Sequence, residues 1–243
     1  MKCLAIDVGN SRIKWGIYSN GWLQLDAVEL AYAESLQQAW SSFKDIDRVI
    51  AVNVAGPHIQ SLIENWLNPL RSPVEWVVSA PILGGIKNGY LEPEKLGIDR
   101  LVGMIAAWHH SKRPVVVVAC GTAITVDAVD HRGHFLGGLI LPGKKLGSRS
   151  LAEGAYGLEI LSGQYSPFPV QTGDAIYSGL IEAVCGAVER MAGRLQVITH
   201  TRPSIILGGG DAGLIGAHLQ IEYEYHEYLV LNGLVCIRDE PDA

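Results

Sequence analysis

The sequence predicts an α/β fold made of two similar halves, residues 1–113 and residues 114–243. In both halves, short apolar segments of strand length alternate with longer segments of helical periodicity. Each half opens with an apolar strand, a glycine turn and a second strand, and the two glycines, Gly9 and Gly121, lie 112 residues apart. Because 48% of the 243 residues are hydrophobic and 18% are charged, the chain has enough apolar material for buried cores.

The first half is expected to begin as hairpins and to continue as alternating helices and strands. Turns at Gly9-Asn10-Ser11 and Asn20-Gly21 separate the first three strands. The expected strands are residues 2–6, 13–18, 21–29, 49–54 and 74–78, and the expected helices are residues 33–43, 57–66 and 98–110. A loop rich in Gly and Pro, residues 81–97, is expected to be too polar and broken to enter the core.

The second half repeats this opening. Its expected strands are residues 115–119, 125–129, 135–141 and 204–207, and its expected helices are residues 144–153 and 174–195. One strand–glycine–strand turn occurs in countless hairpins. Two such turns in register, half a chain apart, indicate a duplicated domain with a cleft between the halves.

Charge, cysteine and hydropathy patterns exclude several classes of protein. The net charge is −6, and Lys and Arg are scattered without a basic run, so nucleic-acid binding is not expected. Four cysteines lie far apart with no CxxC pair, which indicates free thiols. No apolar run approaches the ~20 residues of a membrane helix, and the first apolar run ends at Asp7, too soon for a signal peptide. We therefore expect a cytoplasmic protein that binds no membrane.

The segment Asp7-Val8-Gly9-Asn10-Ser11-Arg12-Ile13-Lys14 has the residue types of a phosphate-binding turn. A carboxylate at the end of a buried strand can hold Mg²⁺, directly or through water. Gly9 lets the backbone approach a phosphate, and Lys14 can neutralise its charge. The alternative, which this segment alone leaves open, is an ordinary hairpin turn.

Two further glycine turns follow strands in the second half. Gly121-Thr122-Ala123 offers small residues and a hydroxyl at short range to phosphates, and it would face the first turn across the cleft. Gly209-Gly210-Asp211 would let a flat purine or a ribose lie against backbone. Each turn alone can be an unrelated loop, and Asp127 can be a strand residue without a role. Three glycine turns at strand ends together favour a nucleotide site.

The acceptor side is expected in Lys87-Asn88-Gly89-Tyr90 and Gly97-Ile98-Asp99-Arg100. Phosphoryl transfer needs positioning, charge neutralisation and a group that takes the proton from the attacking hydroxyl. Asp99 stands beside Arg100 in the first turn of an expected helix, where a carboxylate tends to stay ionised. The alternative is an aspartate that only complements the helix dipole.

These motifs, in this order, resemble those of the type III pantothenate kinases, in the superfamily of acetate and sugar kinases, heat-shock protein 70 and actin. Any single motif is weak, but the ordered set is specific and covers nearly the whole chain, from residue 7 to about residue 234. Residues 52–56 and 137–143 also resemble the branch called Bvg accessory factors. The matching motifs are residues 7–14, 88–90, 97–100, 121–127, 137–143 and 209–211.

The resemblance implies a two-lobed, actin-like (ribonuclease H-like) fold with mixed sheets and a nucleotide cleft between the lobes. It implies transfer of the ATP γ-phosphoryl group to pantothenate, the first step of coenzyme A biosynthesis, usually by a homodimer whose partner subunit helps to close the pantothenate site. Asp99 would accept the proton, and Asp7 would serve Mg²⁺. ATP would contact Asp7, Val8, Gly9, Asn10, Ser11, Arg12, Ile13, Lys14, Gly121, Thr122, Gly209, Gly210 and Asp211, and pantothenate would contact Tyr90, Gly97, Ile98, Asp99, Arg100 and Thr172.

One position departs from the family pattern. Most members have an aspartate two residues before the glycine of the second turn, as the ligand of a monovalent cation, K⁺ or ammonium. This chain has Ala119, whose methyl group cannot ligate a cation. Two alternative functions stay open: a catalytically weak accessory or regulatory protein, and a kinase of the same fold with another hydroxyl acceptor.

Overall fold

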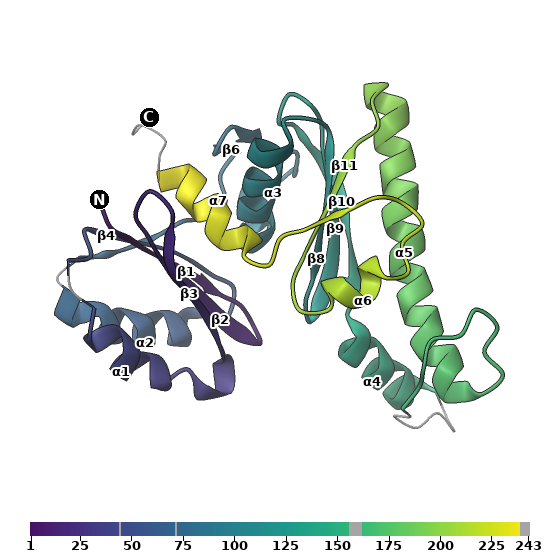
Figure 1. The fold of residues 1–243 in the computed structure, drawn as a ribbon, viewed down its shortest axis with the longest axis horizontal. Helices are drawn as coiled ribbons and strands as arrows, with labels where there is room; N and C mark the ends of the chain where they lie inside the picture. Colours follow the sequence, from purple (N-terminus) through teal and green to yellow (C-terminus); the bar gives the residue numbers. More distant parts are fainter. Residues whose placement is uncertain (44, 71, 156–161, 239–243) are drawn as a thin grey trace. The chain divides into compact units, whose positions relative to one another are not determined.

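The computed structural model describes residues 1–243 except for residues 44, 71, 156–161 and 239–243. The chain divides into two compact units (Figure 1). The first comprises residues 1–110 together with the segment from residue 228 onward, and the second comprises residues 111–227. The cleft between the predicted halves stays a prediction.

The first unit is built on a five-stranded mixed sheet. Its strand order is β3-β2-β1-β4-β5, with β1, β2 and β3 antiparallel and β4 and β5 parallel to β1. Asn20, with a φ of 57°, turns the chain between β2 and β3, as the Asn-Gly pair predicts. The strands are β1 (Cys3–Val8), β2 (Arg12–Tyr18), β3 (Trp22–Glu29), β4 (Arg48–Asn53) and β5 (Val74–Trp76).

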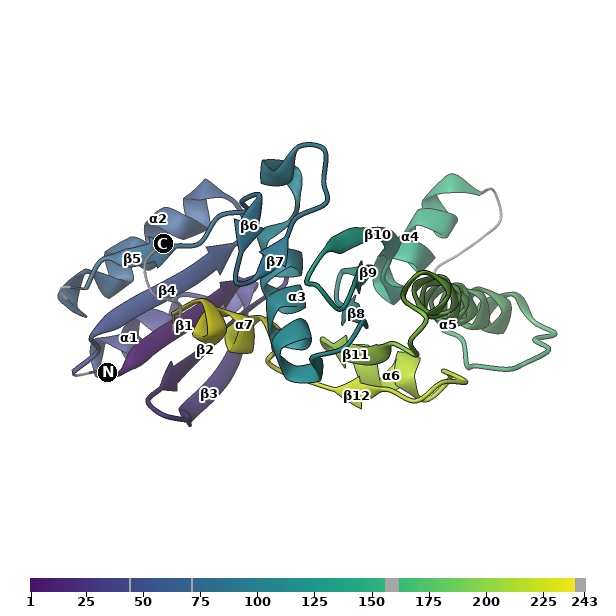
Figure 2. The same cartoon turned by 90° about the horizontal axis from the view of Figure 1, so that it is seen from above.

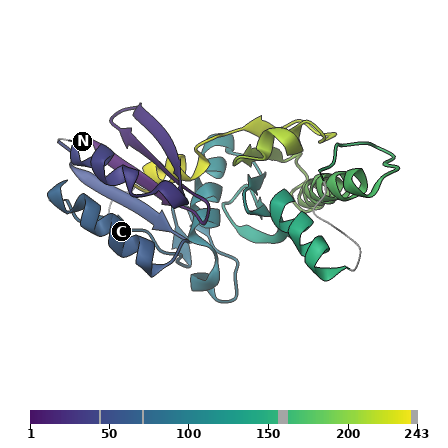
Figure 3. The ribbon, with the colours of Figure 1, turned by 90° about the horizontal axis from the view of Figure 1, so that it is seen from below.

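Helices α1 (Ser35–Ser41) and α2 (Pro57–Leu67) cover one face of this sheet, and Figure 3 shows them in front of it. Pro57 begins α2 at the position where a missing N–H costs nothing. The core between sheet and helices is aromatic, with Trp15, Trp40 and Trp66 in contact at ring-centroid distances of 6.2 and 6.5 Å. Leu4, Ile6 and Val8 of β1 face this core, so the alternate residues, including Asp7, face the other side of the sheet.

Helix α3 (Ile98–Ser111) follows a segment that is more ordered than its composition suggests. The short hairpin of β6 (Ile82–Leu83) and β7 (Ile86–Lys87) lies beside α3 (Figure 2), and its turn glycines Gly84 and Gly85 both have positive φ. A Cβ on Gly84 would overlap Ile105 of α3. Ile86 of the hairpin and Leu96, just before α3, are both buried, so the expectation that residues 81–97 stay out of the core is wrong.

The end of the described chain returns to the first sheet. Helix α7 (Leu229–Arg238) buries Leu231 and Leu234 and contacts β1, β2 and β4, on the opposite side from α1 and α2 (Figure 1). The Trp22 indole N–H donates to Asn232 Oδ1 at 2.9 Å. The predicted halves, 1–113 and 114–243, therefore differ from the compact units in where the last segment lies, because α7 finds its apolar partner surface on the first sheet.

The second unit repeats the first sheet. Its strand order is β10-β9-β8-β11-β12, with the same sequence of antiparallel and parallel pairings. The strands are β8 (Val115–Cys120), β9 (Ala123–Val129), β10 (Phe135–Pro142), β11 (Ser204–Gly208) and β12 (Glu224–Tyr225). The same order in both units matches the duplication that the two glycine turns predict.

Helix α5 (Thr172–Thr199) covers the β8–β9 face of the second sheet, and α4 (Lys144–Gly154) lies beside α5 (Figure 2). The short α6 (Ala212–Gly216) follows β11. The core between sheet and helices is aliphatic and contains Val118, Val126, Ile181 and Leu207. The 28 residues of α5 extend past both ends of the predicted helix. Among the described residues, no helix is both long and apolar enough to cross a membrane.

Candidate active site

The first glycine turn closes the β1–β2 hairpin. The Gly9 N–H donates to the carbonyl of Arg12 at 3.0 Å. Asn10 and Ser11 form the tip of the turn and are exposed, so their polar groups are accessible to a ligand. A Cβ on Gly9 would stand 3.1 Å from the Arg12 carbonyl oxygen. The turn is therefore tight, and its free face is open to a phosphate.

Asp7 is a buried carboxylate next to this turn. Its residue is 9% exposed, and it lies directly opposite Lys14 in the antiparallel pair of β1 and β2. Burial raises the pKa of Asp7 to about 7, while Lys14 lowers it and Asp99 raises it. A cation at this carboxylate would lower that pKa and remove the cost of burying the charge. The donor set, a buried carboxylate beside a phosphate-type turn, fits Mg²⁺.

The acceptor segment, residues 80–97, meets the first turn of α3 through one pair of side chains. An Arg100 Nη1 N–H donates to the Tyr90 hydroxyl at 2.8 Å, and the guanidinium carbon lies 5.7 Å from the centroid of the Tyr90 ring. Arg100 is 8% exposed although it is charged. The first unit thus brings Asp7, Lys14 and Asp99 into one electrostatic neighbourhood, and it joins Tyr90 to the residue next to Asp99.

The second glycine turn closes the β8–β9 hairpin and is pressed against the start of α4. Gly121 and Thr122 are exposed, and the Gly121 N–H donates to the Ala123 carbonyl at 3.2 Å. The Gly143 N–H donates to the Thr122 carbonyl at 3.0 Å. A Cβ on Gly143 would overlap the Gly121 carbonyl oxygen and would stand 2.7 Å from that of Thr122. Only glycine therefore lets α4 begin at this turn.

The third glycine turn lies against the second. Gly209, with a φ of 97°, passes so close to Cys120 that a Cβ would overlap the Cys120 carbonyl. The Asp211 N–H donates to the same carbonyl at 3.3 Å. Burial raises the pKa of Cys120 to about 12, with a further rise from the Asp211 carboxylate, so this thiol stays protonated at neutral pH. The second unit therefore joins its two predicted nucleotide turns.

Ala119 occupies in the second hairpin the place that Asp7 occupies in the first, two residues before the turn glycine. It pairs directly with Thr125 of β9, whose Oγ1 is buried without a hydrogen-bond partner. An alanine methyl group and one hydroxyl do not make the carboxylate-containing ligand set of a monovalent cation. The residues present at Ala119 therefore do not fit the cation that the family resemblance implies.

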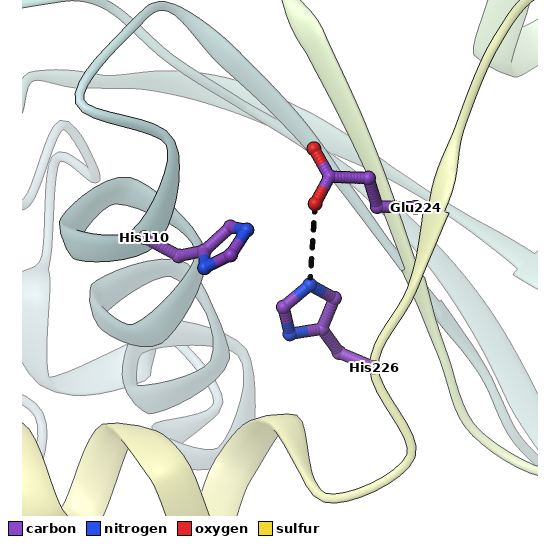
Figure 4. Close-up of side chains that lie close together, drawn as sticks. All are labelled: His110, Glu224 and His226. Carbon is purple, nitrogen blue, oxygen red and sulfur yellow. Dashed lines mark ion pairs between the residues drawn. The ribbon is translucent and has the colours of Figure 1, made fainter.

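Other polar groups of the second unit lie outside these turns. Thr172 is the exposed first residue of α5, and its contact with a substrate stays a prediction. Asp127 is buried in β9 on the face that Thr125 shares. His226 Nε2 lies 3.7 Å from Glu224 Oε2 (Figure 4), while His110, also drawn there, belongs to the first unit.

Sequence reasoning did not assign two contacts of this site. The contact of Gly143 with the second turn could have been found from the Pro142-Gly143 pair that ends β10, since such a pair marks an abrupt change of direction. The bond between Tyr90 and Arg100 has no local signal, because the two residues are ten positions apart in different elements.

Comparison with known proteins identifies the family. The family model described as type III pantothenate kinase matches residues 3–194. Relatives named type III pantothenate kinase include one from Nitrosospira multiformis, 36% identical over 98% of this chain and 91% of its own length. Another, from Leptothrix cholodnii, is 39% identical over 99% of this chain and 97% of its own length.

Solved structures show the fold. A conserved Baf family protein from Campylobacter jejuni has a TM-score of 0.60 at 22% identity, covering 96% of both chains. The activator of 2-hydroxyisocaproyl-CoA dehydratase from Clostridium difficile, with bound ADPNP, has a TM-score of 0.52 at 10% identity over 98% of this chain and 92% of that chain. At these identities the likeness shows the fold alone, and it confirms the predicted actin-like α/β class. From the family model and its near full-length relatives together, the chain belongs to the type III pantothenate kinase family.

Proposed function

We propose that this chain transfers the γ-phosphoryl group of ATP to the primary hydroxyl of pantothenate, giving 4′-phosphopantothenate, the first step of coenzyme A biosynthesis. Family membership supports the reaction. The observation that supports the residue assignment is the buried Asp7 lying opposite Lys14 beside the first glycine turn, with the Asp99 charge raising the pKa of Asp7. This supports a site in the first unit that combines a phosphate-side carboxylate, a cation and a candidate base.

The phosphate side of the reaction is assigned to the glycine turns. Residues 7–14 would receive the ATP phosphates, with backbone N–H groups and Lys14 as donors. Asp7 would hold Mg²⁺, which neutralises phosphate charge when it is bound. Gly121 and Thr122 would contact ATP from the second unit, and Gly209, Gly210 and Asp211 would contact its adenosine part. The contacts of Gly209 and Asp211 with the carbonyl of Cys120, the residue before Gly121, support a shared nucleotide role for the two turns.

The acceptor side is assigned to residues of the first unit. Tyr90 and Gly97, Ile98, Asp99 and Arg100 would bind pantothenate, and Asp99 would accept the proton of the attacking hydroxyl. Arg100 offers a fixed cation for the carboxylate of pantothenate, since its guanidinium is already oriented by the Tyr90 hydroxyl. Thr172, at the start of α5 in the second unit, is proposed as a pantothenate contact on the family resemblance alone.

Release of ADP from MgATP tests this function directly. We expect purified protein to release ADP rapidly only when pantothenate is present. A panel of other hydroxyl acceptors, sugars among them, should stimulate release little in the same assay. Absence of stimulation by pantothenate would favour the regulatory alternative. Stronger stimulation by another alcohol would show that pantothenate is not the acceptor.

A second expectation concerns monovalent cations. Because Ala119 and Thr125 do not fit a cation, turnover should respond only weakly when K⁺ or ammonium replaces choline at constant ionic strength. The variant Ala119→Asp adds the missing carboxylate beside the Thr125 hydroxyl, and its turnover should respond to K⁺. Thermal unfolding in the same salts gives a readout that does not depend on activity. A steep K⁺ titration of the wild type would contradict this expectation.

We propose further that the chain works as a cytoplasmic homodimer. Phe168 and Val170, just before Thr172, are 87% and 96% exposed, which supports a surface that a second subunit covers. Three buried free cysteines and one that is partly buried are compatible with a reducing compartment. Sedimentation as a monomer at micromolar concentration would contradict the dimer, and secretion of the tagged protein would contradict the location.

A further inference from the structure

We infer that Asn88 is a positioning residue for the acceptor, because it holds Tyr90 where the Tyr90 hydroxyl meets Arg100. This inference rests on the proposed function, and it deepens the acceptor side of the same site. Asn88 follows β7 and is 7% exposed. A buried amide side chain is stable only when its polar atoms are bonded, so its partners define what it does.

The Asn88 side chain ties together three backbone positions of the acceptor segment. Its Nδ2 donates to the carbonyl of Ala80 at 3.3 Å and to the carbonyl of Pro93 at 2.9 Å. Its Oδ1 accepts from the N–H of Tyr90 at 3.0 Å. The backbone N–H of Asn88 donates to the carbonyl of Pro81 at 2.9 Å. One amide therefore links the beginning and the end of the segment and fixes the peptide of Tyr90 between them.

Asparagine is the residue that this arrangement requires. The amide group uses both of its N–H donors and its carbonyl acceptor in these three hydrogen bonds. Aspartate has nearly the same shape, but it would turn two donated bonds into contacts between a carboxylate oxygen and two carbonyl oxygens. Alanine would remove all three hydrogen bonds, with the carbonyls of Ala80 and Pro93 and with the Tyr90 N–H. Without them the segment can open.

Asn88 influences the acceptor side of the site through the position of Tyr90. The Tyr90 hydroxyl accepts from Arg100, which is buried and adjacent in sequence to Asp99. The bond joins the acceptor segment to the first turn of α3, where the candidate base stands. When the Tyr90 peptide is free to move, the hydroxyl and the guanidinium no longer offer the acceptor a fixed pair of groups, so binding weakens.

The kinetic test compares Asn88→Asp with Asn65→Asp, a control with the same chemical change on the exposed side of α2. Asn88→Asp should raise the KM for pantothenate roughly tenfold or more, as the loss of two hydrogen bonds implies. The KM for ATP should stay near the wild-type value, and so should both constants of Asn65→Asp. An unchanged KM for pantothenate overturns the inference. A parallel rise of both KM values with a lower Tm also overturns it, because that pattern indicates a general loss of structure.

A double-mutant cycle tests whether Asn88 acts through Tyr90. Asn88→Ala, Tyr90→Phe and the double variant are compared by kcat/KM for pantothenate. If both residues serve the one contact with Arg100, the double variant should be little worse than the more impaired single variant. Additive losses overturn the inference. If Asn88→Ala does not fold, Asn88→Ser takes its place in the cycle. Failure of the proposed function is distinguishable, because wild-type protein would then release no ADP in response to pantothenate, and the inference would fall with it.

Discussion

Replacing Asp99 by asparagine is expected to lower the turnover of pantothenate by at least about two orders of magnitude, the usual contribution of a general base. The asparagine side chain has almost the same shape, but its amide cannot accept the hydroxyl proton. Asp99 lies in the first turn of α3, next to the buried Arg100. Because the substitution leaves the Tyr90–Arg100 contact in place, the KM for pantothenate should change much less than kcat.

Steady-state rates of ADP formation check this expectation. The control variant is Glu34→Gln, at the exposed residue just before α1. A second readout is the pKa of Asp7. Since the Asp99 charge contributes to the raised pKa of Asp7, Asp99→Asn should lower the pH at which Asp7 titrates. A variant that keeps nearly full turnover would remove Asp99 from the role of base and leave the rest of the site to be reassigned.

Asp7→Asn is expected to be less active and more stable than the wild type. The loss of activity follows from the loss of the carboxylate that would hold Mg²⁺ beside the phosphate turn. We expect the rate to require a much higher Mg²⁺ concentration, and to stay below the wild-type rate when Mg²⁺ is saturating. A Mg²⁺ titration of the rate at fixed ATP measures both effects.

The gain of stability depends on pH, and its sign follows from the pKa. Burial raises the pKa of Asp7 from its ordinary value of 3.8 to about 7. The folded protein therefore binds this proton more tightly than the unfolded chain, so the favourable contribution is full below pH 3.8 and is lost as the pH rises through about 7. Asparagine cannot ionise and avoids that loss. The upper limit of the difference is about 4 kcal/mol at alkaline pH, from a shift of about three pKa units.

Thermal or urea unfolding without Mg²⁺, at several pH values between about 4.5 and 8.5, tests the sign of this stability difference. The range brackets the pKa of about 7. The free energies of unfolding of Asp7→Asn and wild type should be close at the acid end and diverge toward the alkaline end, with the variant more stable. Adding Mg²⁺ and ATP should stabilise the wild type more than the variant. Curves that stay parallel across the whole pH range would show that Asp7 carries no buried charge in the folded protein.

Local patterns predicted most of the regular elements, because strand periodicity and turn chemistry act over a few residues. The β1–β2 and β8–β9 hairpins lie where an apolar strand, a glycine turn and a second strand follow one another. Asn20-Gly21 and Pro57 mark a turn and a helix start by their own backbone preferences. The equal strand order of both sheets follows from the repeated opening.

Residue types and motif order predicted the residues of the candidate site, but they did not predict every contact between them. Asp7 and Lys14 share a hairpin, so their proximity was readable from the sequence. Their coupling to Asp99, more than eighty positions away, was not. Nor was the contact of Gly209 with Cys120, since it depends on the parallel pairing of β11 with β8.

The sequence by itself determined the duplicated α/β pattern, the three glycine turns and the family, because each depends on neighbouring residues or on motif order. Only the tertiary structure decided that α7 closes the first sheet, that Asn88 secures the acceptor segment and that burial moves the pKa of Asp7 to about 7. These features arise from contacts between distant segments, whose apolar areas, hydrogen-bond partners and charges meet only after the chain has folded.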